Sequence, residues 1–274
     1  MRRSLAVAGV LALLVGFLAA RFPWKRLLPP LLDTAQAASG AEIRLADLGV
    51  GIGWTGPRVV ARGVVLRWPG TEDLALDAVT LRPAWSLAWL RGQPVWYLEA
   101  SGKPGAWRGE VAPDRVAGEL AELDVASLPW VLLGSLPPLQ GRISGQVDLL
   151  RVNGGWQGSA RLEGEPGSVD LDGLPVAIPY QSLTAQLEIA PERVKLAQAR
   201  LEGPLVTASF SGTAEATGGA FSSWPLDLQV EIEQVDPALR GYLGPLGIPV
   251  DAQGRARLEV TGTLSAPFLS GGAR

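Results

Sequence analysis

Cysteine and histidine are both absent from the 274 residues of this chain. Without cysteine, the chain cannot form a disulfide framework, a thiolate nucleophile or a zinc–thiolate site. Without histidine, a Ser-His-Asp triad, an imidazole general base and the usual transition-metal sites are excluded. Catalysis would have to use carboxylates, lysine or tyrosine. We therefore expect a protein that is not an enzyme, with no catalytic residues, no metal and no cofactor.

A strong charge of one sign is also lacking, because 24 basic residues stand against 27 acidic ones. Nucleic-acid-binding surfaces need a basic field, so nucleic acid is not an expected partner. What the chain does contain is 47% hydrophobic residues, 34 glycines, 22 prolines and ten tryptophans. This composition is sufficient for a buried core, and it favours many short strands joined by turns over a helical bundle.

The N-terminus contains an apolar run, SLAVAGVLALLVGFLAA from Ser4 to Ala20, which is close to the minimum length for a membrane span. Cations flank it on both sides, so charge does not set its orientation. Its terminal position, ahead of a long domain, predicts a signal anchor that carries the rest of the chain across a bacterial inner membrane. We expect the anchor over residues 1–26, a connector over 27–41 and a periplasmic β-sheet domain over 42–274.

The alternative is a cleaved signal peptide, since Ala35-Gln36-Ala37 resembles a cleavage site. Some fifteen residues separate this motif from the apolar run, whereas cleavage sites follow such runs closely. An uncleaved anchor is therefore favoured.

Beyond the connector, apolar and polar residues alternate with a period of two, which is typical of antiparallel strands with one buried face. Leu226 to Glu233 is the clearest case, and Leu183 to Ile189 and Val206 to Ala214 behave in the same way. Weaker strands are predicted at 43–48, 59–67, 74–82, 95–101, 108–111, 116–120, 141–151, 156–163, 193–201 and 254–262.

Turn signals stand between these strands at the spacing of a β-meander, in which sequence neighbours pair in the sheet. They are Pro69-Gly70, Lys103-Pro104-Gly105, Pro113-Asp114, Asn153-Gly154-Gly155, Pro166-Gly167, Pro191-Glu192 and Gly218-Gly219. Three short helices are predicted, at 84–91, 126–133 and 237–243. Asp236 is the expected N-cap of the last helix, with Pro237 at its first position.

Two patterns suggest chemistry at first sight. Gly49-Val-Gly51-Ile-Gly53 has the glycines of a phosphate loop, but no Lys-Ser/Thr and no helix pattern follow it, so we expect a flexible loop there. Paired carboxylates are more typical of the solvated edge of a turn or strand than of a metal or glycosidase site. These pairs are Glu72-Asp73, Glu163 with Glu165, and Asp170 with Asp172.

Tryptophans concentrate in one stretch, at positions 54, 68, 85, 89, 96 and 107. Their amphipathic rings suit a membrane surface or an apolar groove, and ordinary core packing is the other interpretation. If residues 84–91 form a helix, Trp85 and Trp89 share one of its faces.

Several segments, in their order along the chain, resemble a known family. These are Arg62 to Leu66, Leu81-Arg82-Pro83, Leu90-Arg91-Gly92, Gly105 to Glu110, Leu123 to Pro129, Gly141 to Leu149 and Gly254 to Gly262, behind the short basic N-terminus and single anchor. Together they resemble the type II secretion system protein N family, which is itself similar to the AsmA-like proteins of Gram-negative envelopes. The resemblance covers nearly the whole chain and brings no catalytic residues. It implies an inner-membrane-anchored periplasmic accessory of protein secretion, with a curved sheet whose concave face is apolar.

Two functional hypotheses follow. The first is a scaffold or assembly factor that offers a sheet edge or face to other envelope proteins of the secretion system. The second is an AsmA-like protein that binds or transfers lipid, because an apolar sheet face must be covered by protein or by ligand. The expected fold is the same under both hypotheses. It is all-β, an extended curved antiparallel meander that forms a groove or a sandwich. The membrane bilayer is an expected partner under both.

Overall fold

The computed structural model describes residues 41–53, 56–68, 73–85, 94–128, 139–170, 177–216, 223–244, 248–263 and 266–271, with Gln36 and Leu174. Most of these residues are β-strand, and fourteen strands form one antiparallel sheet. Their spatial order is β1-β2-β3-β4-β5-β6-β8-β9-β12-β13-β14-β15-β16-β17. Consecutive strands of this sheet are thus neighbours in space, which confirms the predicted meander.

The strand bounds extend most predictions by one to five residues at an end. The first half comprises β1 (Glu42–Gly53), β2 (Gly56–Arg67), β3 (Leu74–Pro83), β4 (Trp96–Gly102), β5 (Gly105–Ala112), β6 (Arg115–Asp124), β8 (Arg142–Val152) and β9 (Gly155–Gly164). The second half comprises β12 (Ser182–Ala190), β13 (Arg193–Glu202), β14 (Val206–Glu215), β15 (Leu226–Val235), β16 (Ala256–Thr263) and β17 (Ala266–Gly271).

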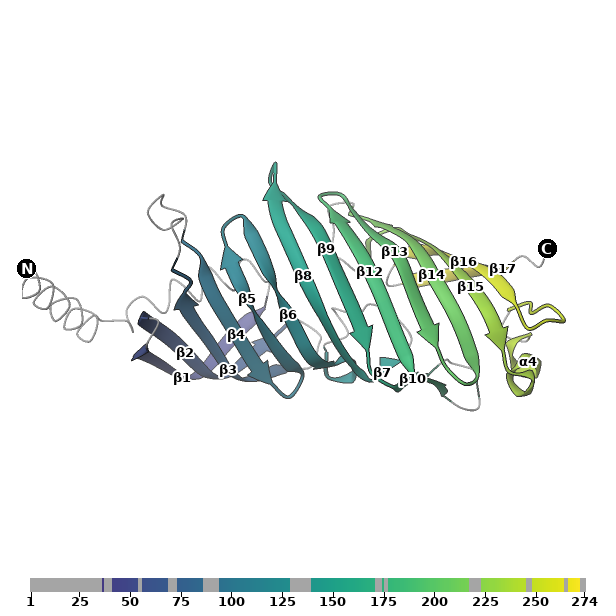
Figure 1. Cartoon of the computed structure of the whole chain (residues 1–274), viewed down its shortest axis with the longest axis horizontal. Helices are drawn as coiled ribbons and strands as arrows, with labels where there is room; N and C mark the ends of the chain where they lie inside the picture. The colour runs from purple at the N-terminus through teal and green to yellow at the C-terminus, as the bar shows by residue number, and fades with distance from the viewer. Residues whose placement is uncertain are drawn as a thin grey trace, which may run out of the picture.

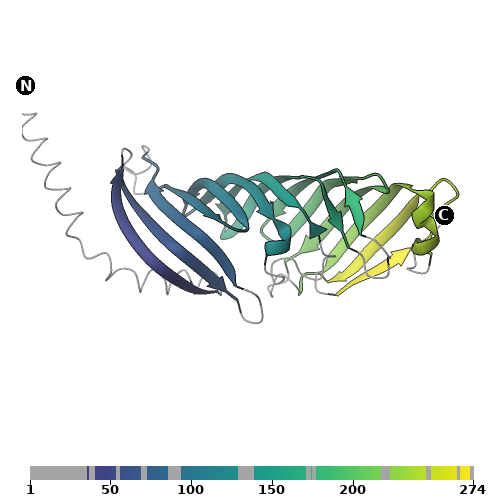
Figure 2. The same ribbon diagram turned by 90° about the horizontal axis from the view of Figure 1, so that it is seen from below.

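The sheet is long in the direction across its strands, which lie slanted side by side in Figure 1. Seen from below in Figure 2, the strands bend and the sheet twists along its length. A right-handed strand twist explains why so many strands do not form a flat sheet.

A second, three-stranded sheet lies along the lower edge of the large one (Figure 1). Its order is β11-β10-β7, from β7 (Leu139–Gln140), β10 (Gly167–Val169) and β11 (Ile178–Tyr180). The Tyr180 hydroxyl donates a hydrogen bond of 3.0 Å to the Gln140 carbonyl and ties the first of these strands to the last. The small sheet thus fills the connections after β6 and β9 with structure that the sequence did not predict.

Helix α4 (Pro237–Leu243) follows β15 as predicted. Asp236 is its N-cap, since its carboxylate accepts a hydrogen bond of 2.8 Å from the Ala238 amide, and Pro237 opens the helix. Leu239 and Leu243 turn toward the sheet and are buried. They join a core made of Ile178, Val206, Ala208, Ile232, Val235, Leu239, Leu243 and Leu258.

The expectation of a loop at the glycine-rich segment is wrong. Gly49 to Gly53 is not a flexible loop, because these residues form the second half of β1 and pair with β2 from Gly49↔Val60 to Gly53↔Gly56. An edge strand tolerates glycines that leave no side chain to pack, since only one neighbour depends on it.

The helix predictions at 84–91 and 126–133 fall partly outside the described residues. Within them, Ala84 and Trp85 are not helical, and a single 3-10 turn, η2 (Val125–Ser127), begins the second region. The turns at Lys103–Pro104, Pro113–Asp114, Asn153–Gly154 and Pro191–Glu192 are confirmed, whereas Gly167 already belongs to β10.

The anchor over residues 1–26 and most of the connector lie outside the described residues. In the part of the chain that the structure describes, no helix is long and apolar enough to cross a membrane.

Candidate binding face

Two rows of apolar residues cross the whole sheet on one face, and each takes one residue from every one of its fourteen strands. The first row is Val50, Val59, Leu81, Leu98, Gly109, Gly118, Val147, Ala160, Leu187, Leu196, Gly212, Leu228, Val260 and Leu269. The second is Leu48, Ala61, Val79, Ala100, Trp107, Leu120, Gly145, Leu162, Ala185, Ala199, Phe210, Val230, Leu258 and Gly271.

Neither row contains a polar side chain. Strands lie about 4.8 Å apart, so each row runs for roughly 60 Å. That distance is about twice the hydrocarbon thickness of a bilayer. We call the surface that these two rows define the apolar face.

The apolar side chains stay on one face because the period-two alternation along the strands is shifted by one residue at two places in the sheet. In β1, β2 and β3 the apolar residues step by three at one line across the sheet, from Leu45 to Leu48, from Ala61 to Val64 and from Leu76 to Val79. Gly63 sits on this line with φ of 56°. Because a residue in this left-handed region breaks the pleat, the side chains beyond it return to the same face.

A second correction lies in β6, where Glu122 has φ of 50° and the register to β8 shifts between Leu120 and Leu123. The bulge keeps both leucines on the apolar face and leaves the Glu122 carboxylate in solvent. Glu122 then pairs with Arg142 at 3.6 Å.

Glycines let neighbouring strands bend closely along the apolar face. A Cβ built at Gly118 would lie 2.6 Å from the Trp107 ring and 2.8 Å from the Gly109 Cα atom. One at Gly145 would lie 2.8 Å from a Leu162 methyl group and closer still to the Arg161 carbonyl. Real Cβ atoms do not approach so closely, so a side chain at either position would push the strands apart and reduce the bend.

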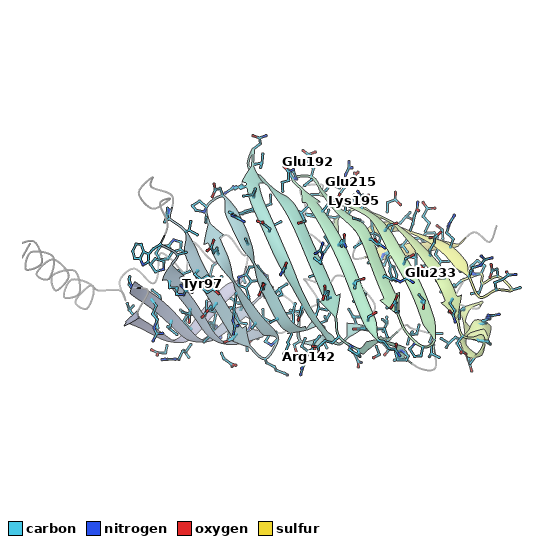
Figure 3. The ribbon with its side chains drawn as sticks, viewed as in Figure 1. Tyr97, Arg142, Glu192, Lys195, Glu215 and Glu233 are labelled. Carbon is cyan, nitrogen blue, oxygen red and sulfur yellow. The ribbon has the colours of Figure 1, made fainter. Side chains whose placement is uncertain are left out.

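The opposite face of the sheet is polar and carries ion pairs between side chains of different strands, and Figure 3 labels Lys195 and Glu233 among these residues. Each pair is substantially exposed, so it contributes little to stability by itself, but together the pairs keep this face hydrated. The cross-strand pairs are Arg62–Asp47, Arg115–Asp148, Lys195–Glu188, Arg200–Glu233 and Arg257–Glu231. Arg82 stacks over the Tyr97 ring on the same face, 4.0 Å from its centroid.

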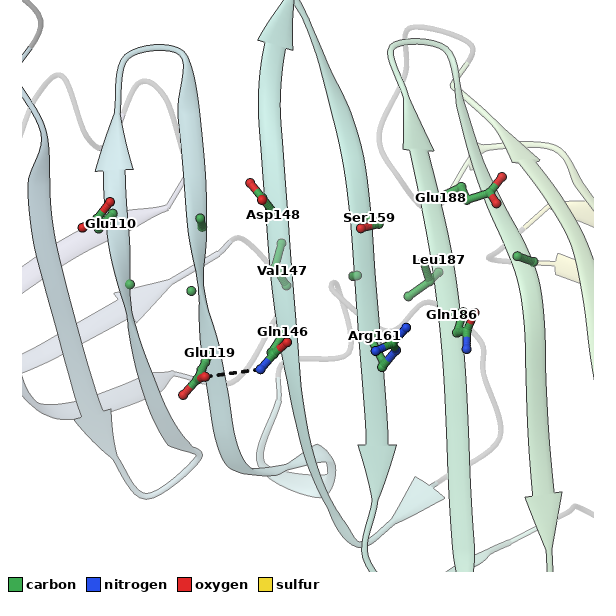
Figure 4. Close-up of a pocket in the computed structure, with 15 residues that line it drawn as sticks. Glu110, Glu119, Gln146, Val147, Asp148, Ser159, Arg161, Gln186, Leu187 and Glu188 are labelled. Atoms are coloured by element: carbon green, nitrogen blue, oxygen red, sulfur yellow. Dashed lines mark hydrogen bonds between the residues drawn. The ribbon is translucent and has the colours of Figure 1, made fainter. Parts of the chain in front are cut away.

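A shallow hollow of about 570 Å³ opens on the polar face over β5 to β13 (Figure 4). Glu110, Asp148 and Glu188 line one side of it in a row, and Glu119 accepts a hydrogen bond of 3.3 Å from Gln146 on the other. Asp148 and Glu188 already pair with Arg115 and Lys195 at 3.2 Å and 3.1 Å. Carboxylates neutralised by neighbours in this way are typical of a solvated sheet face.

Shifted pKa values also mark ion pairs on the surface. A hydrogen bond from Arg200 lowers the pKa of Glu202, and a hydrogen bond from Arg67 lowers the pKa of Asp73. Hydrogen bonds from the Arg255 amide and guanidinium lower the pKa of Asp251. Burial raises the pKa of Tyr180. Tyr180 and Glu202 are neighbours, since the Gln181 amide donates a hydrogen bond of 2.7 Å to the Glu202 carbonyl, but Asp73 lies next to β3 and Asp251 before β16, so the four groups form no common site.

The carboxylates that the sequence suggested are not brought together as a metal site. Glu163 is exposed on β9, and Glu165 and Asp170 lie on either side of β10, while Glu72 and Asp172 are outside the described residues. Among the residues that the structure describes, no group of three or more acidic side chains could hold a metal ion.

The tryptophans divide between the two interpretations. Trp107 belongs to the second apolar row, and Trp96 lies on the same face two pairs further along the strands, opposite Val111; both are half-buried. Trp85 is 61% exposed near the β1–β2 end of the sheet, and Trp54 and Trp89 lie outside the described residues. The apolar rows themselves were not predicted, although the period-two pattern of each strand contains them. They emerge only when the strand register is known.

The apolar face is covered unequally. Of the described residues in the strands of the large sheet, Val64, Pro83 and Ala160 are the buried apolar side chains in β1 to β9. Strands β12 to β17 contribute Ala199, Leu201, Val206, Ala208, Leu226, Ile232, Val235 and Leu258. The large side chains between β4 and β12, such as Leu98, Leu120, Leu162 and Leu187, are half-buried.

Comparison of the chain with family models, with curated proteins and with solved structures gave no match in any of the three.

Proposed function

We propose that this chain is a non-enzymatic envelope protein that binds the acyl chains of lipids along its apolar face. The main observation in support of this proposal is the pair of uncharged rows that cross all fourteen strands. An apolar surface of this size in water requires a cover, since exposed apolar patches above a few hundred Å² are unusual on soluble proteins. In the described part of the chain, α4 and Ile178 of the small sheet form such a cover over β14 to β16, near the C-terminal end.

Acyl chains suit the remaining surface better than a compact ligand does. The rows are long and continuous, and the Trp107 indole is the one hydrogen-bonding side chain in them, so they suit a long apolar ligand and not one with a polar pattern. The ion pairs of the opposite face keep that side in water. We place the sheet in the periplasm, behind an N-terminal anchor over residues 1–26 in the inner membrane, as the sequence predicts.

Mass spectrometry of lipids that copurify with the full chain tests this function. Leu187 and Gln186 are adjacent in β12 and point to opposite faces, since Leu187 lies between Ala160 and Leu196 and Gln186 between Arg161 and Gln198. Leu187→Glu places a charge in the middle of the apolar face and is expected to reduce bound lipid at least tenfold, because an acyl chain would have to cover an ionised carboxylate.

Gln186→Glu is the matched control, since it adds the same charge on the polar face next to Arg161 and is expected to leave lipid binding unchanged. Wild-type protein without copurifying lipid, or equal loss in both variants, would refute the proposal.

A scaffold in the type II secretion system is the second candidate, and strand β1 favours it. This edge strand is twelve residues long, contains no proline, and has no charge from Leu48 to Gly53. Long uncharged edges accept an added strand from a partner. Replacing Val50 with proline would remove one backbone donor from β1. Loss of secretion with retained lipid binding in this variant would favour the scaffold.

A further inference from the structure

Six large apolar side chains are exposed among the described residues, and three of them lie along one edge of the sheet. Leu150 and Val152, at the end of β8, are 50% and 41% exposed, and Trp85 is 61% exposed beyond the end of β3. The other three, Tyr242, Phe268 and Leu269, lie on α4 and β17. The β8–β9 hairpin reaches beyond its neighbours along the upper edge of the sheet in Figure 1.

The tip of this hairpin is held in a defined conformation. Pairing continues to Val152↔Gly155, so Asn153 and Gly154 alone form the loop, with φ of 52° and 86°. Positive φ at both loop residues is the tight turn that best matches strand twist. At its base, Gly155 packs closely against Pro191 of the β12–β13 turn, where a Cβ atom would collide with the ring. The tip is therefore presented by a supported hairpin.

The chemistry of the tip fits a lipid bilayer. Leu150 and Val152 project into solvent from the polar face, in line with Asp148, and Trp156 stands across from Arg151 on the apolar face, one pair below the tip. Aliphatic residues flanked by tryptophan and arginine are the combination found at the boundary between headgroups and acyl chains. Other charges along this edge are of both signs, with Asp114 and Arg115 on one side and Glu192 and Arg193 on the other. Among the described residues, this edge thus shows no basic patch to recruit an acidic surface.

The tip also lies beside the apolar face. Leu149, the neighbour of Leu150, points to the apolar face and pairs with Val116 and Gly158. A lipid that leaves a bilayer at this edge passes the Arg151–Trp156 pair and then meets the apolar side chains that begin at Leu149.

We propose that the β8–β9 hairpin tip, with Leu150 and Val152 at its end, inserts into the interface of a phospholipid bilayer and opens the apolar face to lipids there. This inference rests on the proposed function and adds to it the site of contact with the membrane.

Site-specific labelling tests the proposal on the full chain. Because the chain has no cysteine, Val152→Cys carries an environment-sensitive fluorophore at one position only. The labelled protein is reconstituted into phosphatidylcholine vesicles whose acyl chains are brominated. We expect strong quenching and a blue shift at position 152. Lys103→Cys, in the β4–β5 turn at the opposite edge, is the control and is expected to remain unquenched and accessible to aqueous iodide.

Two results would overturn the proposal. One is a Val152 label as accessible to iodide as the Lys103 label. The other is a label shielded from iodide yet not quenched by brominated lipid, which would indicate a protein partner at the tip. Copurifying lipid together with an aqueous tip would refute this inference and leave the lipid-binding function standing, whereas a quenched tip in a protein without bound lipid would refute the function alone.

Discussion

Strands β14 to β16 and strands β4 to β9 carry the same apolar pattern on the same face, but they bury it to different extents. At the C-terminal end, Val206, Ile232 and Leu258 pack with Leu239 and Leu243 of α4 and are at most 9% exposed. In the middle of the sheet, the equivalent leucines are half-buried. The same alternating pattern therefore has two outcomes, since one region closes a core and the other leaves its apolar side chains half-buried, which is the surface that the proposed function assigns to lipid. We call these regions the covered end and the open middle.

The largest expected effect contrasts one leucine from each region. Leu239→Ala should destabilise the protein by about 3 kcal/mol, because it leaves a cavity in the covered end where Leu239 is 3% exposed. Leu120→Ala in the open middle should cost only about 1 kcal/mol, because the side chain is half-buried and the site collapses easily. Urea denaturation of the lipid-free protein measures both. Equal losses would mean that the open middle is covered as well as the end.

Glycine-to-alanine substitutions in the same two regions should change the free energy of unfolding by smaller amounts. Gly118→Ala should cost about 2 kcal/mol, because its Cβ meets Trp107 and Gly109 and the open middle must straighten. Gly241→Ala on α4 should instead stabilise by up to about 1 kcal/mol, since nothing lies within 4 Å of its Cβ and alanine favours helix. Thermal unfolding and lipid binding of both variants check this. If the Gly118→Ala variant binds lipid normally, the bend of the sheet at Gly118 is not needed for lipid binding on the apolar face.

Most strands could be predicted from the sequence because period-two alternation is a local signal. Leu226 to Glu233 specified both a strand and its buried face without knowledge of its neighbours. Asp236 and Pro237 likewise encode the start of α4. By contrast, β7 and β11 have two and three residues, too few to show a period, and their pairing depends on tertiary contacts such as that of Tyr180 with Gln140.

The second half of β1 was missed for a related reason. Glycines at 49, 51 and 53 remove half of the alternating side chains, so the pattern imitates a loop while the backbone pairs with β2. The candidate site is harder still to predict, because the apolar rows join residues far apart in sequence. Val50 and Leu269 belong to one row only through thirteen successive registers. Local periodicity indicates that each strand has an apolar face but not that all fourteen faces align.

Acid should weaken the ion pairs of the polar face in both the covered end and the open middle. Glu202, which lies near the covered end, gives the most direct test. Arg200 lowers the pKa of Glu202 in the folded protein, so the unfolded chain takes up the proton first as the pH falls below the ordinary value of 4.5. The resulting stabilisation is present above that pH and is lost as the pH falls through the lowered folded pKa. Glu202→Gln removes it, so the difference in urea midpoint between wild type and variant should be larger at pH 7 than at pH 3. A difference that stays constant between these two pH values would show that the Arg200–Glu202 pair does not stabilise the fold.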